Sequence, residues 1–369
     1  MKRLTLFLMA TAWFGLVASS LCAQQPATNP DQLLLKNFRP KSLYQTPRTE
    51  VNRAKYPVID MHSHSYPENP EQVATWVRNM DSVGVDQTVV MTYQTGDAFD
   101  SLVRVYKQYP GRFILFCGFD YTGYDEPGYG PAAVAELERC VRMGARGVGE
   151  LGDKGQGLLY SQPTPAYGMH IDDARMNSLI DKCGELGVPI SIHVAEPIWM
   201  YAPMDSTNDG LMNAYTWRLD DQPDIPDHAG MVKTLENAVR DHPGTTFIAC
   251  HYANCSYDLT ILGKLLDQYP NLYADNAARY AETATIPRYV ASFYDKYQDR
   301  LVFGTDLGIE PEVYRTLFRI LESSDEHFYD LERFGYHWAL NGYGLPDEVL
   351  RKVYRTNALN LLQIDLREQ

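Results

Sequence analysis

Eight short apolar segments, separated by longer stretches, recur along this sequence from Pro57 onward. Most are bounded by Gly, Pro or Asp, which is typical of strands buried in a parallel sheet. They occupy residues 58–61, 87–91, 113–116, 147–150, 190–193, 247–250, 272–274 and 301–304. A chain with this many buried parallel strands needs a layer of helices to cover them.

Amphipathic segments with helical periodicity lie between most of these strands, and one closes the chain. They include residues 71–83, 132–143, 175–186, 231–240, 259–268 and 348–362. Strict alternation of strands and helices predicts an α/β fold, a closed (β/α)₈ TIM barrel, over residues 57–369. An open doubly wound sheet is the alternative, but no Gly-rich phosphate turn follows the first strand.

The first 23 residues differ from the rest. Lys2 and Arg3 precede an apolar run over residues 4–17, and small residues follow up to Ala23. This order predicts a cleaved signal peptide over residues 1–23, and the apolar run is shorter than the roughly 20 residues that span a bilayer. We therefore expect an exported protein, periplasmic or secreted, with no membrane span after cleavage. Leu21 before Cys22 argues against a lipoprotein.

Residues 24–56 are rich in Pro, Asn, Gln and Lys and show no sustained periodicity, so we expect an extended lead-in to the barrel. The formal net charge of −14 would repel a phosphate backbone and argues against nucleic acid as a partner. An odd number of cysteines, five, follows the leader, so buried free thiols are expected rather than a disulfide framework. Homo-oligomerisation is left open.

Residues with metal-binding side chains fall at the ends of the predicted strands. His62 and His64 end the first strand, and their spacing of two turns both imidazoles to one face. Glu150 ends the fourth strand, His193 the fifth, His251 the sixth and Asp306 the eighth. Active sites of barrels form at the carboxyl ends of strands, so we expect these six side chains to meet at one rim.

Imidazole and carboxylate are the ligands that divalent transition metals accept. The sequence therefore predicts one or two divalent ions, zinc first, with manganese, iron or nickel as alternatives. A lone histidine at a strand end is often a structural residue, but five strand-terminal ligands in concert are not explained that way. A bound ion would lower the pKa of water and polarise a carbonyl group.

The order of these ligands resembles that of the amidohydrolase superfamily. Residues 57–64 resemble its first-strand motif, residues 247–251 its sixth-strand motif and residues 302–306 its eighth-strand motif. Residues 355–359 resemble the terminal helix of the decarboxylase-like branch, amidohydrolase type 2. The resemblance spans residues 57–363 and implies a metal-dependent barrel enzyme.

The fourth strand leaves the number of ions open. Many two-metal relatives carry a carboxylated lysine there, whereas Glu150 in this chain resembles the bridging residue of TatD-like hydrolases. In a two-metal site, Glu150 would join one ion on His62, His64 and Asp306 to another on His193 and His251. In a one-metal site, His62, His64, His193 and Asp306 would hold the ion, and His251 would act in acid–base catalysis or orientation. Glu150 could instead pair with Lys154.

Asp306 is the expected catalytic base, because a carboxylate beside activated water can take its proton and pass it to the leaving group. Long loops after barrel strands form the substrate mouth, so Trp199 and Tyr201, after the fifth strand, are expected to contact a small-molecule substrate. Arg279, after the seventh strand, could hold a substrate carboxylate, or pair with Asp275 or Glu282.

Three functions are compatible with these residues. The first is hydrolysis of an amide, ester or lactone, favoured by Asp306 and by Glu150 as a bridge. The second is decarboxylation of an aromatic or unsaturated acid, which the branch resemblance allows and which needs one ion and a carboxylate-binding arginine. The third, a binding protein without catalysis, is disfavoured because the ligand set is intact. Metal content near one or near two distinguishes the first two.

Overall fold

The computed structural model describes residues 29–364, so the leader predicted over residues 1–23 lies outside the described residues. The chain divides into two compact units, residues 1–38 and residues 39–369. The described part of the first unit holds one short 3₁₀ turn, Leu35–Asn37. The second unit holds all the strands and α-helices described below.

Eight parallel strands form the sheet of the second unit, each hydrogen-bonded to the next along the chain. They are β1 (Val58–His64), β2 (Val85–Met91), β3 (Phe113–Cys117), β4 (Gly147–Asp153), β7 (Ile190–Val194), β8 (Phe247–Ala249), β9 (Leu272–Asp275) and β10 (Leu301–Val302). An antiparallel hairpin, β5 (Gly157–Leu158) and β6 (Ala166–Tyr167), extends β4. All eight predicted segments overlap these strands, although several bounds differ, and the predicted TIM barrel is confirmed.

The first and last strands close the barrel through the segment after β10. Met61 N donates to Phe303 O at 2.8 Å, and Asp306 N donates to His62 O at 2.9 Å. Gly304 permits this approach, because a Cβ atom there would lie 2.7 Å from Cβ of His62. The loop carrying Asp306 is therefore fixed to the strand carrying His62 by backbone contacts.

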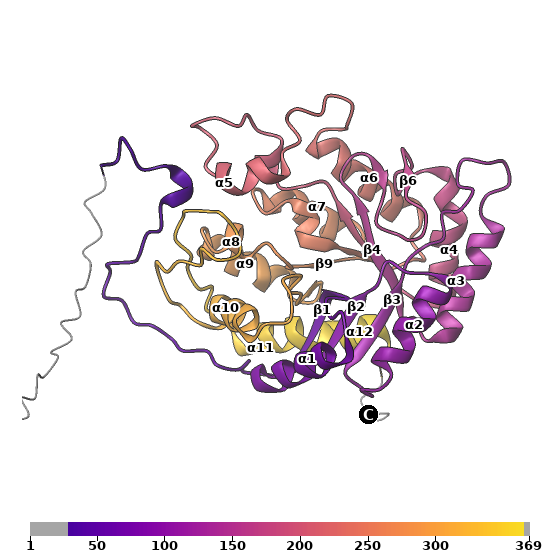
Figure 1. Cartoon of the computed structure of the whole chain (residues 1–369), viewed down its shortest axis with the longest axis horizontal. Coiled ribbons are helices and arrows are strands. Elements are labelled where there is room, and N and C mark those ends of the chain that lie inside the picture. The colour runs from indigo at the N-terminus through magenta and orange to yellow at the C-terminus, as the bar shows by residue number, and fades with distance from the viewer. Residues whose placement is uncertain (1–28, 365–369) are drawn as a thin grey trace, which may run out of the picture. The chain divides into compact units, whose positions relative to one another are not determined.

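Helices cover the outside of the sheet, as α2, α3 and α4 do beside β3 and β4 in Figure 1. The longer ones are α1 (Pro70–Val83), α2 (Gly96–Tyr106), α3 (Pro131–Met143), α4 (Asn177–Leu186), α6 (His228–Asp241), α7 (Leu259–Gln268), α9 (Pro287–Tyr297) and α10 (Pro311–Glu322). Short helices are α5 (Leu211–Ala214), α8 (Tyr280–Thr283), α11 (Asp347–Arg351) and α12 (Asn357–Leu362). The predicted closing helix over 348–362 is interrupted by a π-helical turn, Lys352–Thr356.

Two apolar clusters stabilise this arrangement. The larger one lies between the strands and the outer helices, with Trp76, Phe99 and Tyr294 fully buried. The smaller one joins strand residues such as Ile59, Val89 and Phe116 to the apolar side chains of α12. Burial of each such side chain contributes about 1.5–3 kcal/mol, so α12 is an integral part of the barrel.

The later part of the predicted lead-in contacts the barrel through specific bonds. Thr49 donates to Asp325 from both its amide, at 2.8 Å, and its hydroxyl, at 2.7 Å. Ala54 N donates to Val83 O, and the guanidinium of Arg351 lies 3.7 Å from the ring centre of Tyr56. Residues 39–56 form no α-helix or strand, as expected for an extended segment.

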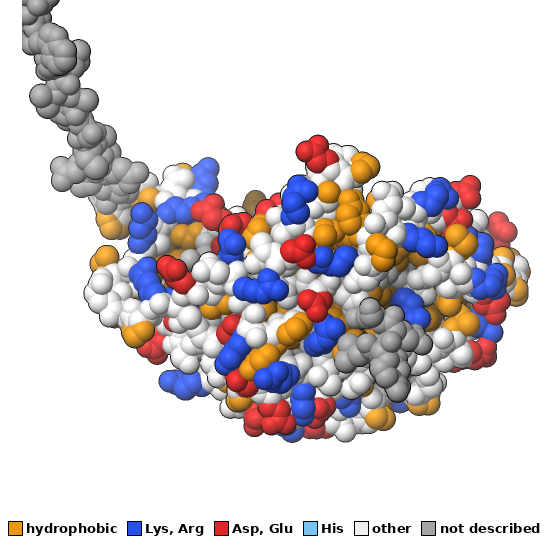
Figure 2. Space-filling view, turned by 90° about the horizontal axis from the view of Figure 1, so that it is seen from below, with side chains coloured by type: hydrophobic (Ala, Val, Ile, Leu, Met, Phe, Trp, Pro, Cys, Tyr) orange, Lys and Arg blue, Asp and Glu red, His pale blue; other side chains and the backbone are white. Residues whose placement is uncertain are grey.

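Three further features concern the charged surface, the cysteines and the helices. On the face shown in Figure 2, acidic and basic side chains are interspersed and form no patch of one sign. Within residues 29–364, every cysteine is buried and free, as expected. Over the same range, no helix has the length and apolar character needed to span a membrane.

Candidate metal centre

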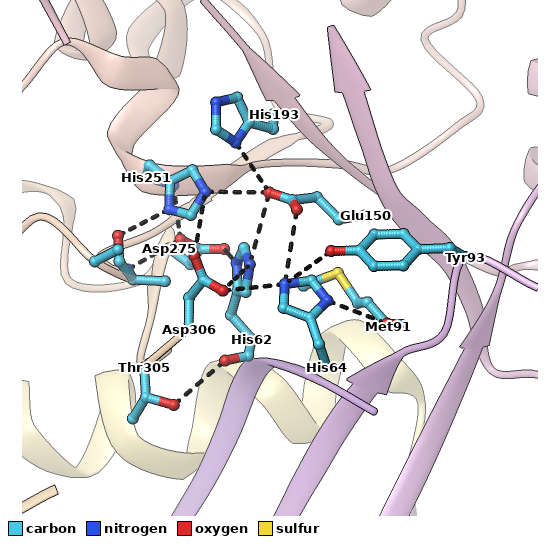
Figure 3. Close-up of polar contacts among 12 residues, drawn as sticks. His62, His64, Met91, Tyr93, Glu150, His193, His251, Asp275, Thr305 and Asp306 are labelled. Carbon is cyan, nitrogen blue, oxygen red and sulfur yellow. Dashed lines mark hydrogen bonds and ion pairs between the residues drawn. The ribbon is translucent and has the colours of Figure 1, made fainter. Parts of the chain in front are cut away.

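Six side chains from five strand ends meet at the carboxyl rim of the barrel (Figure 3). They are the six that the sequence singled out: His62, His64, Glu150, His193, His251 and Asp306. β1 supplies two histidines, β4 the glutamate, β7 the third histidine, and the segments after β8 and β10 supply His251 and Asp306.

Glu150 lies between the four histidines. Its Oε1 atom is 3.1 Å from His251 Nε2, 3.2 Å from His193 Nδ1 and 3.6 Å from His62 Nε2. Its Oε2 atom is 3.7 Å from His64 Nε2. The residue before Glu150 is a glycine because β4 runs close to β7 at this point. A Cβ atom at Gly149 would lie only 2.8 Å from Ser191. Glu150 forms no ion pair with Lys154, which pairs with Glu196 instead.

Asp306 faces three of these histidines. Its Oδ1 atom is 3.0 Å from His64 Nε2 and 3.8 Å from His62 Nε2, and Oδ2 is 3.9 Å from His251 Nε2. Burial alone would raise its pKa, but His62, His64 and His251 hold that pKa well below the ordinary value. Both carboxyl groups of the centre are therefore ionised, since the neighbouring imidazoles also hold the pKa of Glu150 low despite its burial.

Each histidine uses one ring nitrogen to donate to a protein acceptor and turns the other toward these carboxylates. His62 Nδ1 donates to Asp275 Oδ2 at 2.8 Å, and His64 Nδ1 to Met91 O at 3.1 Å. His251 Nδ1 donates to Ala277 O at 2.8 Å, and His193 Nε2 to Ala195 O at 2.9 Å. Such outer hydrogen bonds fix the tautomer and orientation of metal-ligating histidines.

A cation fits the space between these groups. Among the described residues, His62 Nε2 is a buried ring nitrogen without a hydrogen-bond partner, although two carboxylates lie within 4 Å of it. Burial lowers the pKa of His62, but Asp275, Asp306 and Glu150 outweigh this effect and raise it to about 10. A lone pair facing two carboxylates requires a proton or a metal ion, and histidine with carboxylate is a donor set for divalent metals.

The donors form overlapping groups, and His62 belongs to several of them, including one with His251 and Asp275 and one with Glu150 and Cys250. His62, His64 and Asp306 can share an ion, and so can Glu150, His193 and His251, because the ligand atoms within each group lie within 4.8 Å of one another. Within the part of the chain that the structure describes, no such group combines His193 with His64 and Asp306. The one-ion set expected from the sequence, with His193 beside His62, His64 and Asp306, stays a prediction.

Strained backbone surrounds the centre. Residues His251, Tyr252, Ala253 and Asn254 all have positive φ, forming a left-handed turn directly after β8. Asp306, Ala195 and Ala278 also have positive φ and follow other barrel strands. This conformation costs roughly 1–2 kcal/mol per non-glycine residue and concentrates at functional sites.

Asn254 and Asp275 hold the left-handed turn in place. Asp275 Oδ1 accepts from His251 N at 2.7 Å, and Asn254 Nδ2 donates to Val194 O at 2.9 Å. Arg279 Nε donates to Asn254 Oδ1 at 2.8 Å, and His228 Nε2 donates to Asn254 O at 2.9 Å. Neither Asp275 nor Asn254 was expected to have such a role, although the position of Asp275, directly after the predicted seventh strand, is a signal that could have indicated it.

A cavity of about 340 Å³ opens above the centre. His64, Glu150, His193, His251 and Asp306 line it together with Arg279, one of the three residues expected to bind substrate. An ion pair of Arg279 with Asp275 or Glu282 was one expectation from the sequence, but the guanidinium lies 3.8 Å from the carboxylate of Glu196 instead. Aromatic walls come from Tyr93, Tyr160, Trp217 and Phe334.

The other two expected substrate contacts, Trp199 and Tyr201, do not belong to this lining. Trp199 packs against Tyr336 and Trp338, with ring centres 6.3 and 5.7 Å away, and Tyr201 packs edge-on against His228. The loop after β7 does reach the cavity, but through Pro197, Met200 and Trp217. The short 3₁₀ turn Ile198–Met200 turns Met200 inward and leaves Trp199 in a separate aromatic cluster.

The fold and the rim of ligands define a (β/α)₈ barrel with a candidate metal centre. A family model described as Amidohydrolase (Amidohydro_2) matches residues 49–364. The chain belongs to this amidohydrolase family, as the resemblance predicted. No comparison bears on the TatD-like position of Glu150, which stays a prediction, and no protein of curated function matches this chain.

Solved structures share the fold at low sequence identity. The 2,6-dihydroxybenzoate decarboxylase from Rhizobium is 18% identical, with a TM-score of 0.52 over 84% of this chain and 99% of that one. A Polaromonas dihydroxybenzoic acid decarboxylase with bound manganese and 2-nitroresorcinol is 17% identical, with a TM-score of 0.51 over 84% and 97%. The 5-carboxyvanillate decarboxylase of Novosphingobium aromaticivorans, also with manganese, is 14% identical, with a TM-score of 0.51 over 86% and 100%.

Proposed function

We propose that this chain is a metal-dependent enzyme that acts on a small carboxylic acid, with decarboxylation as the first candidate reaction. The observation that carries the proposal is the set of four histidines, each oriented by an outer hydrogen bond toward Glu150 and Asp306 at the floor of the cavity. Orientation of this kind costs conformational freedom and serves to bind a cation.

His62, His64 and Asp306 would hold the first ion, and manganese is the ion to load first because two of the similar structures contain it. A divalent ion bound there would supply positive charge that stabilises negative charge on substrate oxygens. The expectation of zinc has no support from these comparisons.

The aromatic walls favour a planar substrate, because Tyr93, Tyr160, Trp217 and Phe334 can pack against a ring. Decarboxylation breaks the bond between the ring carbon and the carboxyl carbon, releases CO₂, and requires a proton at the ring carbon. His193 lines the cavity, and Glu150 and Glu196 outweigh the effect of burial and raise its pKa. We assign His193 the delivery of this proton, with His251 and Glu150 holding it in place.

Hydrolysis of an ester, lactone or amide is the second candidate, favoured by the position of Glu150. Its carboxylate lies beside both ligand groups, within 3.7 Å of all four histidines, where it could bridge two ions. Asp306, with its low pKa, would then serve as the base that takes a proton from water.

One experiment separates these reactions. Manganese-loaded protein is incubated with hydroxybenzoic acids carrying ¹³C in the carboxyl group, and in parallel with esters and lactones of the same rings. Release of labelled CO₂ with about one ion per chain supports decarboxylation, whereas hydrolysis with about two ions supports the second candidate. Turnover of neither set by metal-loaded protein would contradict the proposal.

We also propose that the protein is exported, and this proposal rests only on the signal-peptide pattern of residues 1–23. The amino-terminal sequence of the protein recovered from a periplasmic extract or the culture medium tests it, with cleavage after Ala23 as the expected result. An intact Met1 on protein from the cytosolic fraction alone would contradict it.

A further inference from the structure

Two cations share one carboxylate at the wall of the cavity. Glu196 forms an ion pair with Lys154, and its Oε2 atom lies 3.8 Å from Arg279 Nη2. The same oxygen is 3.7 Å from Nε2 of His193. Within residues 29–364, neither cation forms an ion pair with a second carboxylate, so Glu196 is the one ion-pair partner of both.

Arg279 is committed to the protein. Its Nε donates to Asn254 Oδ1 at 2.8 Å and its Nη1 donates to Ala278 O at 3.1 Å. Its side chain is only 8% exposed. The nearby Glu282 accepts from Tyr336 at 3.0 Å and pairs with neither cation. Arg279 therefore supports the left-handed turn that carries His251.

Lys154 is the more accessible cation of the pair. It lies directly after β4, and its side chain is 28% exposed. Its ammonium group lies 4.9 Å from the ring centre of Trp217 and 5.9 Å from that of Tyr160, and all three residues line the cavity. An ammonium group held between two aromatic walls can meet a planar acid at its charged end.

We propose that Lys154 binds a carboxylate of the substrate and that Trp217 and Tyr160 flank the ring beside it. The inference rests on the proposed function, because it takes this cavity as the substrate site. It adds a residue and a charge requirement: an anionic group can form a charge-assisted hydrogen bond with the partly exposed ammonium group of Lys154. A neutral compound of the same shape gains no such ionic contact.

Titration calorimetry with two probes tests the inference. Benzoate and its neutral counterpart benzamide are titrated into the manganese-loaded full chain, and into the variants Lys154→Met and Lys154→Arg. We expect benzoate to bind the wild type more tightly than benzamide does. Loss of one charge-assisted contact in Lys154→Met should weaken benzoate about tenfold or more, leave benzamide within about twofold, and be largely rescued in Lys154→Arg.

Controls distinguish this role from a structural one. Lys233→Met removes a lysine from an exposed Lys–Glu pair elsewhere, on α6, and should bind both probes as the wild type does. Manganese content is measured for every variant. Equal benzoate affinity in wild type and Lys154→Met would overturn the inference, as would equal binding of the two probes by the wild type. A second neutral variant, Lys154→Gln, is measured in the same way. Loss of manganese in both Lys154→Met and Lys154→Gln would also overturn the inference, because the role of Lys154 would then be to hold Glu196 and His193 in place rather than to bind substrate.

Failure of this inference can be distinguished from failure of the proposed function. A chain that binds manganese and turns over an acid, yet fails the benzoate comparison, keeps the proposed function and loses the role of Lys154. A chain that binds no manganese at its histidines loses the proposed function, whatever its affinity for benzoate.

Discussion

Asp275 joins two of the candidate metal ligands: it accepts a hydrogen bond from Nδ1 of His62 at 2.8 Å and another from the amide of His251 at 2.7 Å. The carboxylate is fully buried at the end of β9. One side chain thus fixes the ring of a histidine on β1 and the backbone of another after β8, so it couples the two ligand groups.

The first prediction concerns this carboxylate. Asp275→Asn keeps the shape but removes the charge that orients His62, so manganese affinity should fall by about 10- to 100-fold, as is typical for outer-shell partners. Competition with a fluorescent chelator measures it. Asp299→Asn, at an exposed pair with Lys352, is the matched control. Unchanged affinity in Asp275→Asn would show that His62 needs no orienting partner.

The second prediction concerns pH and the metal-free protein. The pKa of His62, lowered by burial but raised more by Asp275, Asp306 and Glu150, is about 10 against an ordinary 6.5. A histidine with a raised folded-state pKa stabilises the fold fully below about 6.5, and this contribution is lost as pH rises toward about 10. The difference in Tm between wild type and His62→Asn, measured in chelator, should therefore shrink from pH 6 to pH 10. A constant difference would contradict this.

The third prediction concerns the left-handed turn. Asn254→Ala removes the acceptor of Arg279 and the donor to Val194, leaving buried groups without partners. We expect a loss of about 2–3 kcal/mol in the free energy of unfolding, measured by urea denaturation of the metal-free protein. Asn360→Ala, on the exposed face of α12, should stay within about 0.5 kcal/mol of wild type. Equal effects of the two variants would remove Asn254 from this role.

The fourth prediction separates two tryptophans. Trp217 lines the cavity beside Lys154, so Trp217→Ala should weaken benzoate binding by about threefold to tenfold. Trp199 packs on Tyr336 and Trp338 instead, so Trp199→Ala should leave binding within about twofold and cost about 1–3 kcal/mol of stability. Calorimetry and urea denaturation give the two quantities. The reverse pattern would restore Trp199 as a substrate contact.

Periodicity and position made the barrel and its rim predictable. Each strand was recognisable because a buried parallel strand is a continuous apolar run, and His193 stood out because it ends such a run. Gly304 illustrates the limit: its closeness to His62 depends on how β10 meets β1, and no local pattern encodes that contact.

The remaining features depend on backbone conformations that sequence patterns do not indicate. His251 follows β8 in a left-handed turn of residues without glycine, which local propensity disfavours and tertiary contacts enforce. For the same reason, the inward and outward residues of the loop after β7 could not be assigned, and Trp199 was chosen where Trp217 lines the cavity.

The most direct test of the account is the manganese content of the wild type and of Asp306→Ala, measured by elemental analysis after loading and gel filtration. Asp306 forms one candidate ligand group with His62 and His64, so removal of its carboxylate should release the ion held by that group. We predict at least one ion per chain in the wild type and at least one fewer in Asp306→Ala. A wild-type protein that retains no manganese, zinc or iron under any loading condition would contradict the account.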